Sequence, residues 1–109
     1  FKENCPDIRN SKVVDMVREF QAWGMQVVVS DPVADPDEVR HEYGIDLQTI
    51  DAEHPVDVLV VAVGHGSYRA MTPADLRPLC RGEQPILADV KSLYDRHAAG
   101  AQGFAVFRL

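Results

Sequence analysis

The feature that most constrains the fold is an unbroken apolar run, Val58 to Val63, in the middle of the chain. The run has the length of a β-strand, and a strand with one face in water would alternate between apolar and polar residues. A strand that is apolar throughout is typical of a parallel sheet covered by helices on both faces. We therefore expect residues 57–63 to form a central strand of such a sheet.

Helix signals alternate with strand-sized runs along the rest of the chain. A polar cap followed by proline and an acidic residue occurs at Asp35–Glu38 and at Thr72–Asp75, and this order is the signature of a helix N-terminus. A further helix is expected between the caps Asn10 and Ser11 and the terminating Gly24. The second and third helices are expected to end at Gly44 and Gly82, and the other strands to occupy residues 26–30, 85–90 and 104–108.

This alternation predicts the architecture. Strands separated by helices of about ten residues imply right-handed parallel connections, so we predict an α/β domain over residues 1–109, a three-layer open parallel sheet with helices on both faces. The length suffices for one core and not for two. Because such sheets bind ligands beyond the carboxyl ends of their strands, the positions of interest are Asp31 and Pro32, Gly64 to Gly66, and Asp89 to Lys91.

The charge balance excludes several classes of function. The chain has 11 Lys and Arg against 17 Asp and Glu, a net charge of −6, and no basic cluster. We therefore expect neither nucleic acid nor a membrane surface as a partner. No apolar run approaches the length of about 20 residues that a spanning helix needs. Cys5 and Cys80 lack metal-ligand spacing and no secretion signal is present, so free thiols and a cytoplasmic location are expected.

No complete catalytic set is visible. Gly64 to Gly66 contains part of a dinucleotide-binding loop but lacks its third glycine, and the four histidines share no metal-binding spacing, so we expect no metal. His65 follows the central strand, where it would either contact a ligand or be satisfied by the loop backbone. Lys91 would bring a cation to an anionic ligand or be a solvated surface lysine. Cys5 has basic neighbours that would favour a thiolate, but no partner base.

The segment before the first helix, residues 1–10, is rich in hydrogen-bonding groups. Helix N-termini favour anions, so this segment is either an anion site or a capping loop with an Asp7–Arg9 surface pair.

The combination of these motifs resembles the C-terminal domain of the UDP-glucose/GDP-mannose dehydrogenase family over nearly the whole chain. The order is FK, a polar loop, D-x-R, an amphipathic helix and a strand ending in DP, followed by later family segments. The ENCPDIRN form most resembles the branch that acts on UDP-N-acetylhexosamines. The matching segments are FKENCPDIRNSKVVDMVREFQAWGMQVVVSDP, DPDEVRHEYGIDL, AVGHGSYRAM, ADVKSLYDR and FRL.

The resemblance implies a Rossmann-like domain that closes over a nucleotide-sugar, whereas an N-terminal domain binds NAD and a helical middle region supplies the catalytic cysteine. The full enzyme would oxidise the sugar C6 alcohol to a carboxylate in two NAD-dependent steps, for polysaccharide biosynthesis. This chain would bind the UDP-sugar, associate with the rest of a homo-oligomeric enzyme and be inactive alone. The family's first strand precedes FK and would be missing from this sheet.

The resemblance also implies roles for individual residues. Phe1 and Lys2 would line the sugar-diphosphate site, and Lys91 would lie where the family places a basic residue near the nucleotide-sugar. Asp7 and Arg9 would order the loop that follows. Some relatives have arginine at position 91, and lysine offers one point of charge in place of a bidentate fork.

Two positions receive no such role. His65 matches a family motif without an assigned function, and Cys5 is not expected to be the nucleophile, because the catalytic cysteine belongs to a region that this chain lacks. No residue of the chain is therefore expected to be catalytic. Two alternatives remain: an assembly module with exposed apolar faces and no ligand of its own, and a free-standing regulator that uses His65 as a pH-sensitive ligand contact.

Overall fold

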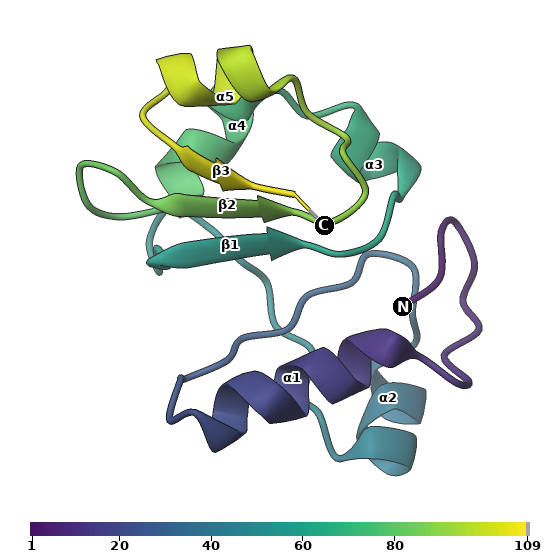
Figure 1. The fold of residues 1–109 in the computed structure, drawn as a ribbon. Coiled ribbons are helices and arrows are strands. Elements are labelled where there is room, and N and C mark those ends of the chain that lie inside the picture. Colours follow the sequence, from purple (N-terminus) through teal and green to yellow (C-terminus); the bar gives the residue numbers. More distant parts are fainter. Residues whose placement is uncertain (109) are drawn as a thin grey trace. The chain divides into compact units, whose positions relative to one another are not determined.

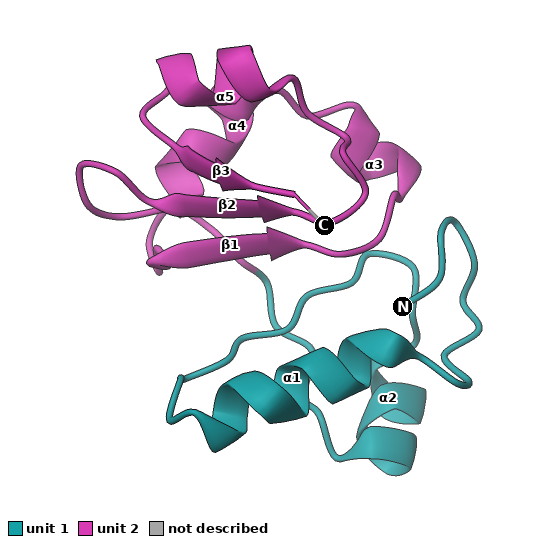
Figure 2. Cartoon of the chain, in the orientation of Figure 1, with its two compact units in different colours: residues 1–49 teal, residues 50–109 magenta. Residues whose placement is uncertain are grey.

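The computed structural model describes residues 1–108, which form two compact units divided after residue 49 (Figure 2). Each unit contains its own cluster of buried apolar side chains. The length of the chain predicts a single core, whereas the described residues form two buried clusters, one in each unit. The units are described separately below.

Unit 1 consists of residues 1–49 and contains helices α1 (Lys12–Ala22) and α2 (Pro36–Tyr43) (Figure 1). Both helices begin at predicted caps: Ser11 accepts from the backbone N–H of Val13, and Asp35 accepts from that of Asp37. Gly44 ends α2 with a φ of 69°, a left-handed conformation in which a side chain is strained. The buried cluster comprises Phe1, Ile8, Val14, Ala34 and Val39.

The prediction of a buried strand at residues 26–30 is wrong. Within this segment, Val29 forms a single parallel bridge to Leu47, and the backbone N–H of Gln48 donates to the carbonyl of Val29 over 2.8 Å. Residues 27–29 are half-buried. The β-branched residues favour an extended backbone, but a strand also requires a row of hydrogen-bonding partners, and a single bridge does not provide one.

Unit 2 contains three parallel strands among its described residues, in the order β1 (Val58–Val61), β2 (Ile86–Asp89) and β3 (Ala105–Phe107). Three of the four predicted strands are thus confirmed, each shortened at its ends. Figure 1 shows all three arrows pointing the same way, as the predicted α/β class with an open parallel sheet requires. The helical elements are α3 (Gly66–Arg69), α4 (Pro73–Leu76), the 3₁₀ turn η1 (Arg77–Leu79) and α5 (Arg96–Ala101).

Burial alternates along the strands of unit 2, whereas the unbroken apolar run predicted cover on both faces. Leu59, Val61 and Leu87 belong to a cluster that also contains Phe104, and α5 packs against β3. The alternate residues of β1, which point to the opposite face, are less buried, and 41% of Val58 is exposed. One face of the sheet therefore carries most of the packing of this unit.

The helix predicted from Thr72 to Gly82 starts as expected and ends early. Thr72 and Asp75 form a reciprocal capping box, with N–H to side-chain distances of 2.8 and 3.3 Å. The α-helix ends at Leu76 and continues as η1. Pro78 explains the change, because it lacks an N–H and its ring crowds the carbonyl of the preceding turn. Within residues 1–108, no helix has the length and apolar character required to cross a bilayer.

Candidate functional site

The segment before α1, residues 1–10, gathers two cations around one carboxylate. The Lys2 ammonium donates to Asp7 over 3.2 Å, and the Arg9 guanidinium donates to both Asp7 oxygens over 3.0 and 2.9 Å. The backbone N–H of Arg9 adds a bond of 2.9 Å. Arg9, and then Lys2, hold the pKa of the Asp7 carboxyl well below its usual range. The three side chains carry a net charge of +1.

These two cations remain accessible. Lys2 is 42% exposed at its side chain and Arg9 is 81% exposed. A tight turn holds Lys2 in place, because the backbone N–H of Cys5 donates to the Lys2 carbonyl over 3.2 Å. The structure therefore contains the Asp7–Arg9 surface pair of the second reading, and Asp7 also holds a second cation, Lys2.

Phe1 lies in the buried cluster of unit 1. Its ring is parallel to that of Tyr43, with centroids 5.9 Å apart, and the residue is 8% exposed. The Tyr43 hydroxyl donates to the carbonyl of Ile8, and the amino group of Phe1 donates to Asp31. The ring thus anchors the loop that carries Lys2 and does not form an open surface.

In unit 2, the polar side chains gather at the carboxyl ends of the strands. Asp89, the last residue of β2, is fully buried, and its two carboxylate oxygens accept from the backbone N–H groups of Leu93 and Tyr94, each over 2.9 Å. Lys91 is exposed on the loop that these bonds close. Ser92 has a φ of 53°. The predicted cation therefore lies on a tight loop with a buried carboxylate beneath it.

His65 is buried in the loop after β1, directly before α3. Its exposed fraction is 1%, and its ring meets that of Tyr68 edge to face, with centroids 5.4 Å apart. Its carbonyl accepts from the backbone N–H groups of Tyr68 and Arg69 at the start of α3. The sequence left two roles open for His65, contact with a ligand or packing within its own loop, and this burial supports the second.

The structure also reveals neighbours of this edge that the sequence did not predict. Arg69 donates through Nε to the carbonyl of Gly64 over 3.1 Å, and Tyr94 donates its hydroxyl to the carbonyl of Tyr68 over 2.7 Å. Arg108, just beyond β3, donates to the carbonyl of Tyr94. The spacing of Arg69 contained a usable signal: it lies one helical turn beyond His65, within reach of the preceding strand end.

Gly64 has a specific steric reason to lack a side chain. A Cβ at this position would lie 2.7 Å from Nη2 of Arg69. The guanidinium thus occupies the space over Gly64 that the glycines of a dinucleotide-binding loop leave for a pyrophosphate. The chain also lacks the third glycine of that loop, so Gly64 to Gly66 do not form the complete glycine-rich turn that binds the pyrophosphate of NAD.

The two cysteines differ in environment. Cys80 is buried in the cluster of unit 2, and this burial raises the pKa of its thiol. Cys5 is half-buried in the N-terminal loop. Both carry free thiols, and the described residues contain no group of three or more potential metal ligands.

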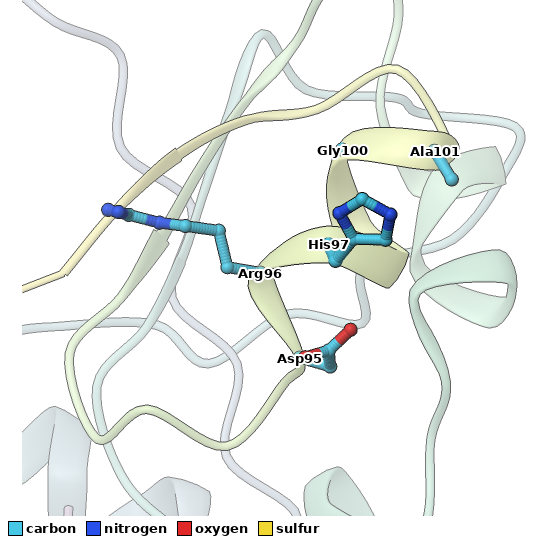
Figure 3. Close-up of a pocket in the computed structure, with 5 residues that line it drawn as sticks. All are labelled: Asp95, Arg96, His97, Gly100 and Ala101. Carbon is cyan, nitrogen blue, oxygen red and sulfur yellow. The ribbon is translucent and has the colours of Figure 1, made fainter.

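A shallow depression of about 520 Å³ lies over α5 (Figure 3). It contains none of the predicted site residues, and Asp95 already caps the helix by accepting from the N–H of Ala98 over 2.8 Å. Arg96 extends away from His97 in Figure 3, so the two do not form a pair there. Its lining consists of Asp95, Arg96, His97, Gly100 and Ala101.

The predicted site residues therefore form two groups. Lys2, Asp7 and Arg9 lie together in unit 1, with Phe1 beneath them, and Lys91 lies at the carboxyl edge of the sheet in unit 2. An open parallel sheet with helices after its strands and polar groups at its carboxyl edge defines an α/β domain of the Rossmann-like class. The chain belongs to the UDP-glucose/GDP-mannose dehydrogenase family, because the family's UDP binding domain matches residues 1–96.

Individual relatives agree with this assignment. The chain is 41% identical over 95 residues to a UDP-N-acetyl-D-glucosamine 6-dehydrogenase of Pseudomonas aeruginosa, which covers 87% of this chain and 22% of that protein. It is 40% identical over 92 residues to the Salmonella typhi protein of the same name, covering 84% and 21%. Protein CapL of Staphylococcus aureus is 43% identical over 68 residues, covering 62% and 16%. The chain thus spans no more than 22% of the length of these relatives.

A solved structure supports the fold. The NDP-N-acetyl-D-galactosaminuronic acid dehydrogenase from Methanosarcina mazei Go1 matches with a TM-score of 0.85 over 99% of this chain and 22% of that chain. The sequences are 19% identical, so this likeness concerns the fold.

Proposed function

We propose that this chain is the UDP-sugar-binding domain of an NAD-dependent nucleotide-sugar 6-dehydrogenase. The observation that carries the proposal is the pair of accessible cations, Lys2 and Arg9, held on one carboxylate in a chain with a net charge of −6. A diphosphate is an anion that such a group recognises. Family membership and relatives named as UDP-N-acetyl-D-glucosamine 6-dehydrogenases support a UDP-sugar as the ligand.

In this proposal the residues act by binding and orientation. In unit 1, Lys2 contacts a diphosphate, and Asp7 fixes the Lys2 ammonium while Arg9 holds Asp7 in place. In unit 2, Lys91 offers a cation to the same kind of anion. The stack of Phe1 on Tyr43 secures the loop from below. His65 stays within the fold of its own loop.

The oxidation itself takes place outside this chain. NAD supplies hydride acceptance when bound elsewhere in the enzyme, because Gly64 to Gly66 lack the third glycine of a dinucleotide-binding loop. The catalytic cysteine belongs to another region, and this domain holds the nucleotide while the sugar C6 alcohol is oxidised to a carboxylate. We further propose a cytoplasmic, homo-oligomeric enzyme that supplies sugar acids for polysaccharide biosynthesis.

The test is Lys2→Ala in the intact dehydrogenase. Loss of one charge-assisted contact should raise the KM for the UDP-sugar about 10-fold and leave the KM for NAD unchanged. Lys12→Ala, which removes an exposed lysine from the first turn of α1, is the matched control and should change neither constant. An unchanged KM for the UDP-sugar in Lys2→Ala would remove Lys2 from the site. Comparing UDP, UDP-glucose, UDP-N-acetylglucosamine and GDP-mannose as ligands would then define the substrate.

One observation favours a second role, in assembly. Trp23 and Met25, at and just after the C-terminal end of α1, are 66% and 50% exposed, and Phe20 contacts Trp23 edge to face. Exposed aromatic and thioether groups are typical of surfaces that bind another protein. Gel filtration of the 109-residue chain, together with a titration of the same sample with UDP, separates the two roles. A monomer that binds UDP supports the nucleotide site, and a dimer that binds no UDP supports assembly.

A further inference from the structure

The loop that carries Lys91 is built around one buried carboxylate. Asp89 is 0% exposed, and each of its two carboxylate oxygens accepts a backbone N–H from the loop, from Leu93 and from Tyr94. The backbone of Asp89 takes part as well, because its carbonyl accepts from the N–H of Ser92 over 3.3 Å. One residue thus satisfies three successive N–H groups of the loop.

The far side of the loop is also fixed. Tyr94 is 4% exposed, its hydroxyl donates to the carbonyl of Tyr68 over 2.7 Å, and its own carbonyl accepts from Arg108. Ser92 adopts a φ of 53°, a conformation that costs free energy for a residue with a side chain and persists where surrounding bonds enforce it. Lys91 lies between these constraints, exposed at the turn of the loop.

We propose that Asp89 is a positioning residue that sets the place of the Lys91 ammonium through the loop backbone, without touching the ligand itself. This inference rests on the proposed role of Lys91 at the diphosphate. A lysine side chain is a flexible four-carbon stem, and ordering it costs conformational entropy. A contact of the ammonium with the ligand therefore adds affinity only beyond that cost. A rigid backbone on both sides of Lys91 reduces the number of positions that its ammonium visits.

The chemistry of the acceptor requires a carboxylate. Both oxygens of Asp89 accept, so an asparagine would place its NH₂ group against one of the two loop N–H groups, where two donors face each other. Asp89→Asn therefore preserves the size of the side chain and removes one of the two bonds. This makes it a specific probe of loop geometry.

The experiment is a double-mutant cycle in the intact dehydrogenase with Asp89→Asn and Lys91→Ala. We expect Asp89→Asn to raise the KM for the UDP-sugar about 5-fold to 10-fold, with little change in kcat or in the KM for NAD. In the Lys91→Ala background, Asp89→Asn should have no further effect. The matched control is Asp75→Asn, which alters another carboxylate that accepts a backbone N–H, over 2.8 Å, and should leave the KM unchanged.

The outcomes separate the two proposals. If Lys91→Ala leaves the KM unchanged, the role of Lys91 at the diphosphate fails, and the positioning role fails with it. A second outcome is that Lys91→Ala raises the KM for the UDP-sugar, but Asp89→Asn leaves it unchanged or raises it equally with and without Lys91. That outcome overturns the positioning role alone.

A second variant covers the case in which Asp89→Asn does not fold. Ser92→Pro changes an exposed residue, imposes a negative φ where the loop has 53°, and removes the N–H that bonds the Asp89 carbonyl. It should raise the KM for the UDP-sugar in the presence of Lys91 and not in its absence. An unchanged KM in Ser92→Pro would show that loop geometry does not govern Lys91, which overturns the inference.

Discussion

The two loops that carry the proposed binding lysines, one in each unit, hold these lysines in opposite ways. In the N-terminal loop, Lys2 is paired directly to Asp7, and the pair lies at the surface, where water and salt reach it. In the loop after β2, Lys91 is exposed while the carboxylate that organises its backbone, Asp89, is fully buried.

The comparison shows two routes to a placed cation. A surface ion pair contributes little to stability because solvent screens it, whereas buried hydrogen bonds are costly to remove because their donors cannot turn to water. We expect the first loop to respond to salt and acid and the second to mutations that alter its packing.

The largest difference is expected from removing each carboxylate. Asp89→Ala leaves the N–H groups of Leu93 and Tyr94 without their acceptors, and the free energy of unfolding of the chain should fall by about 3 kcal/mol. Asp7→Ala, the same change at the surface, should shift the urea midpoint far less. Urea unfolding followed by circular dichroism measures both. Equal shifts for the two variants would remove the distinction between the loops.

The stability contributed by the two loops should also be lost at opposite ends of the pH scale. The pKa of Asp7 is lowered by Arg9 and Lys2, so the stabilisation from this carboxylate is complete above the ordinary pKa of 3.8 and is lost as the pH falls below it. Burial, with the nearby charge of Asp89, raises the pKa of Tyr94 from 10.0 to about 12. Its contribution is therefore complete below pH 10.0 and is lost between pH 10.0 and about 12.

Two titrations test this prediction. The carboxyl carbon shift of Asp7, followed by NMR, should titrate at a lower pH than that of a free aspartate, and Arg9→Ala should bring it back toward the ordinary value. The ultraviolet absorbance of tyrosinate should show one late-titrating group that Tyr94→Phe removes. Normal titration of either residue would contradict the corresponding half of the prediction.

The smallest effect concerns the strand end beside the loop of Lys91. A Cβ at Gly64 would displace the Arg69 guanidinium, whose flexible end can move away, so Gly64→Ala should cost only about 1 kcal/mol. In an Arg69→Ala background the obstacle is gone, and the same change should be neutral or slightly stabilising, since alanine restricts the unfolded chain. A cost that is the same in both backgrounds would show that Arg69 is not the obstacle.

The parts of the fold that could be predicted from the sequence are those decided locally. Ser11, Asp35 and Thr72 start helices because a side-chain oxygen next to a helix N-terminus has N–H groups within its reach. Gly44 likewise ends a helix for a local reason, its left-handed φ. The strands within residues 57–63 and 85–90 carry enough apolar residues to be recognised without knowledge of their partners.

The parts that escaped prediction depend on contacts between distant segments. Residues 26–30 have strand-forming residues, and whether they form a strand is decided by a neighbour elsewhere in the chain, which supplies one bridge at Leu47. At the site, the sequence marked Lys91 but not the role of Asp89, because burial and the two accepted N–H groups become visible only when the loop is folded. The cover of Gly64 by Arg69 was missed for the same reason.

The contrast between the two cysteines has a practical consequence. Cys80 is enclosed among apolar side chains with a raised thiol pKa, which makes it a poor target for alkylating reagents at neutral pH. Cys5 closes the turn opposite Lys2. Within this chain, a maleimide fluorophore would therefore label the N-terminal loop selectively, and its emission would test the proposed binding of a nucleotide there without any engineered cysteine.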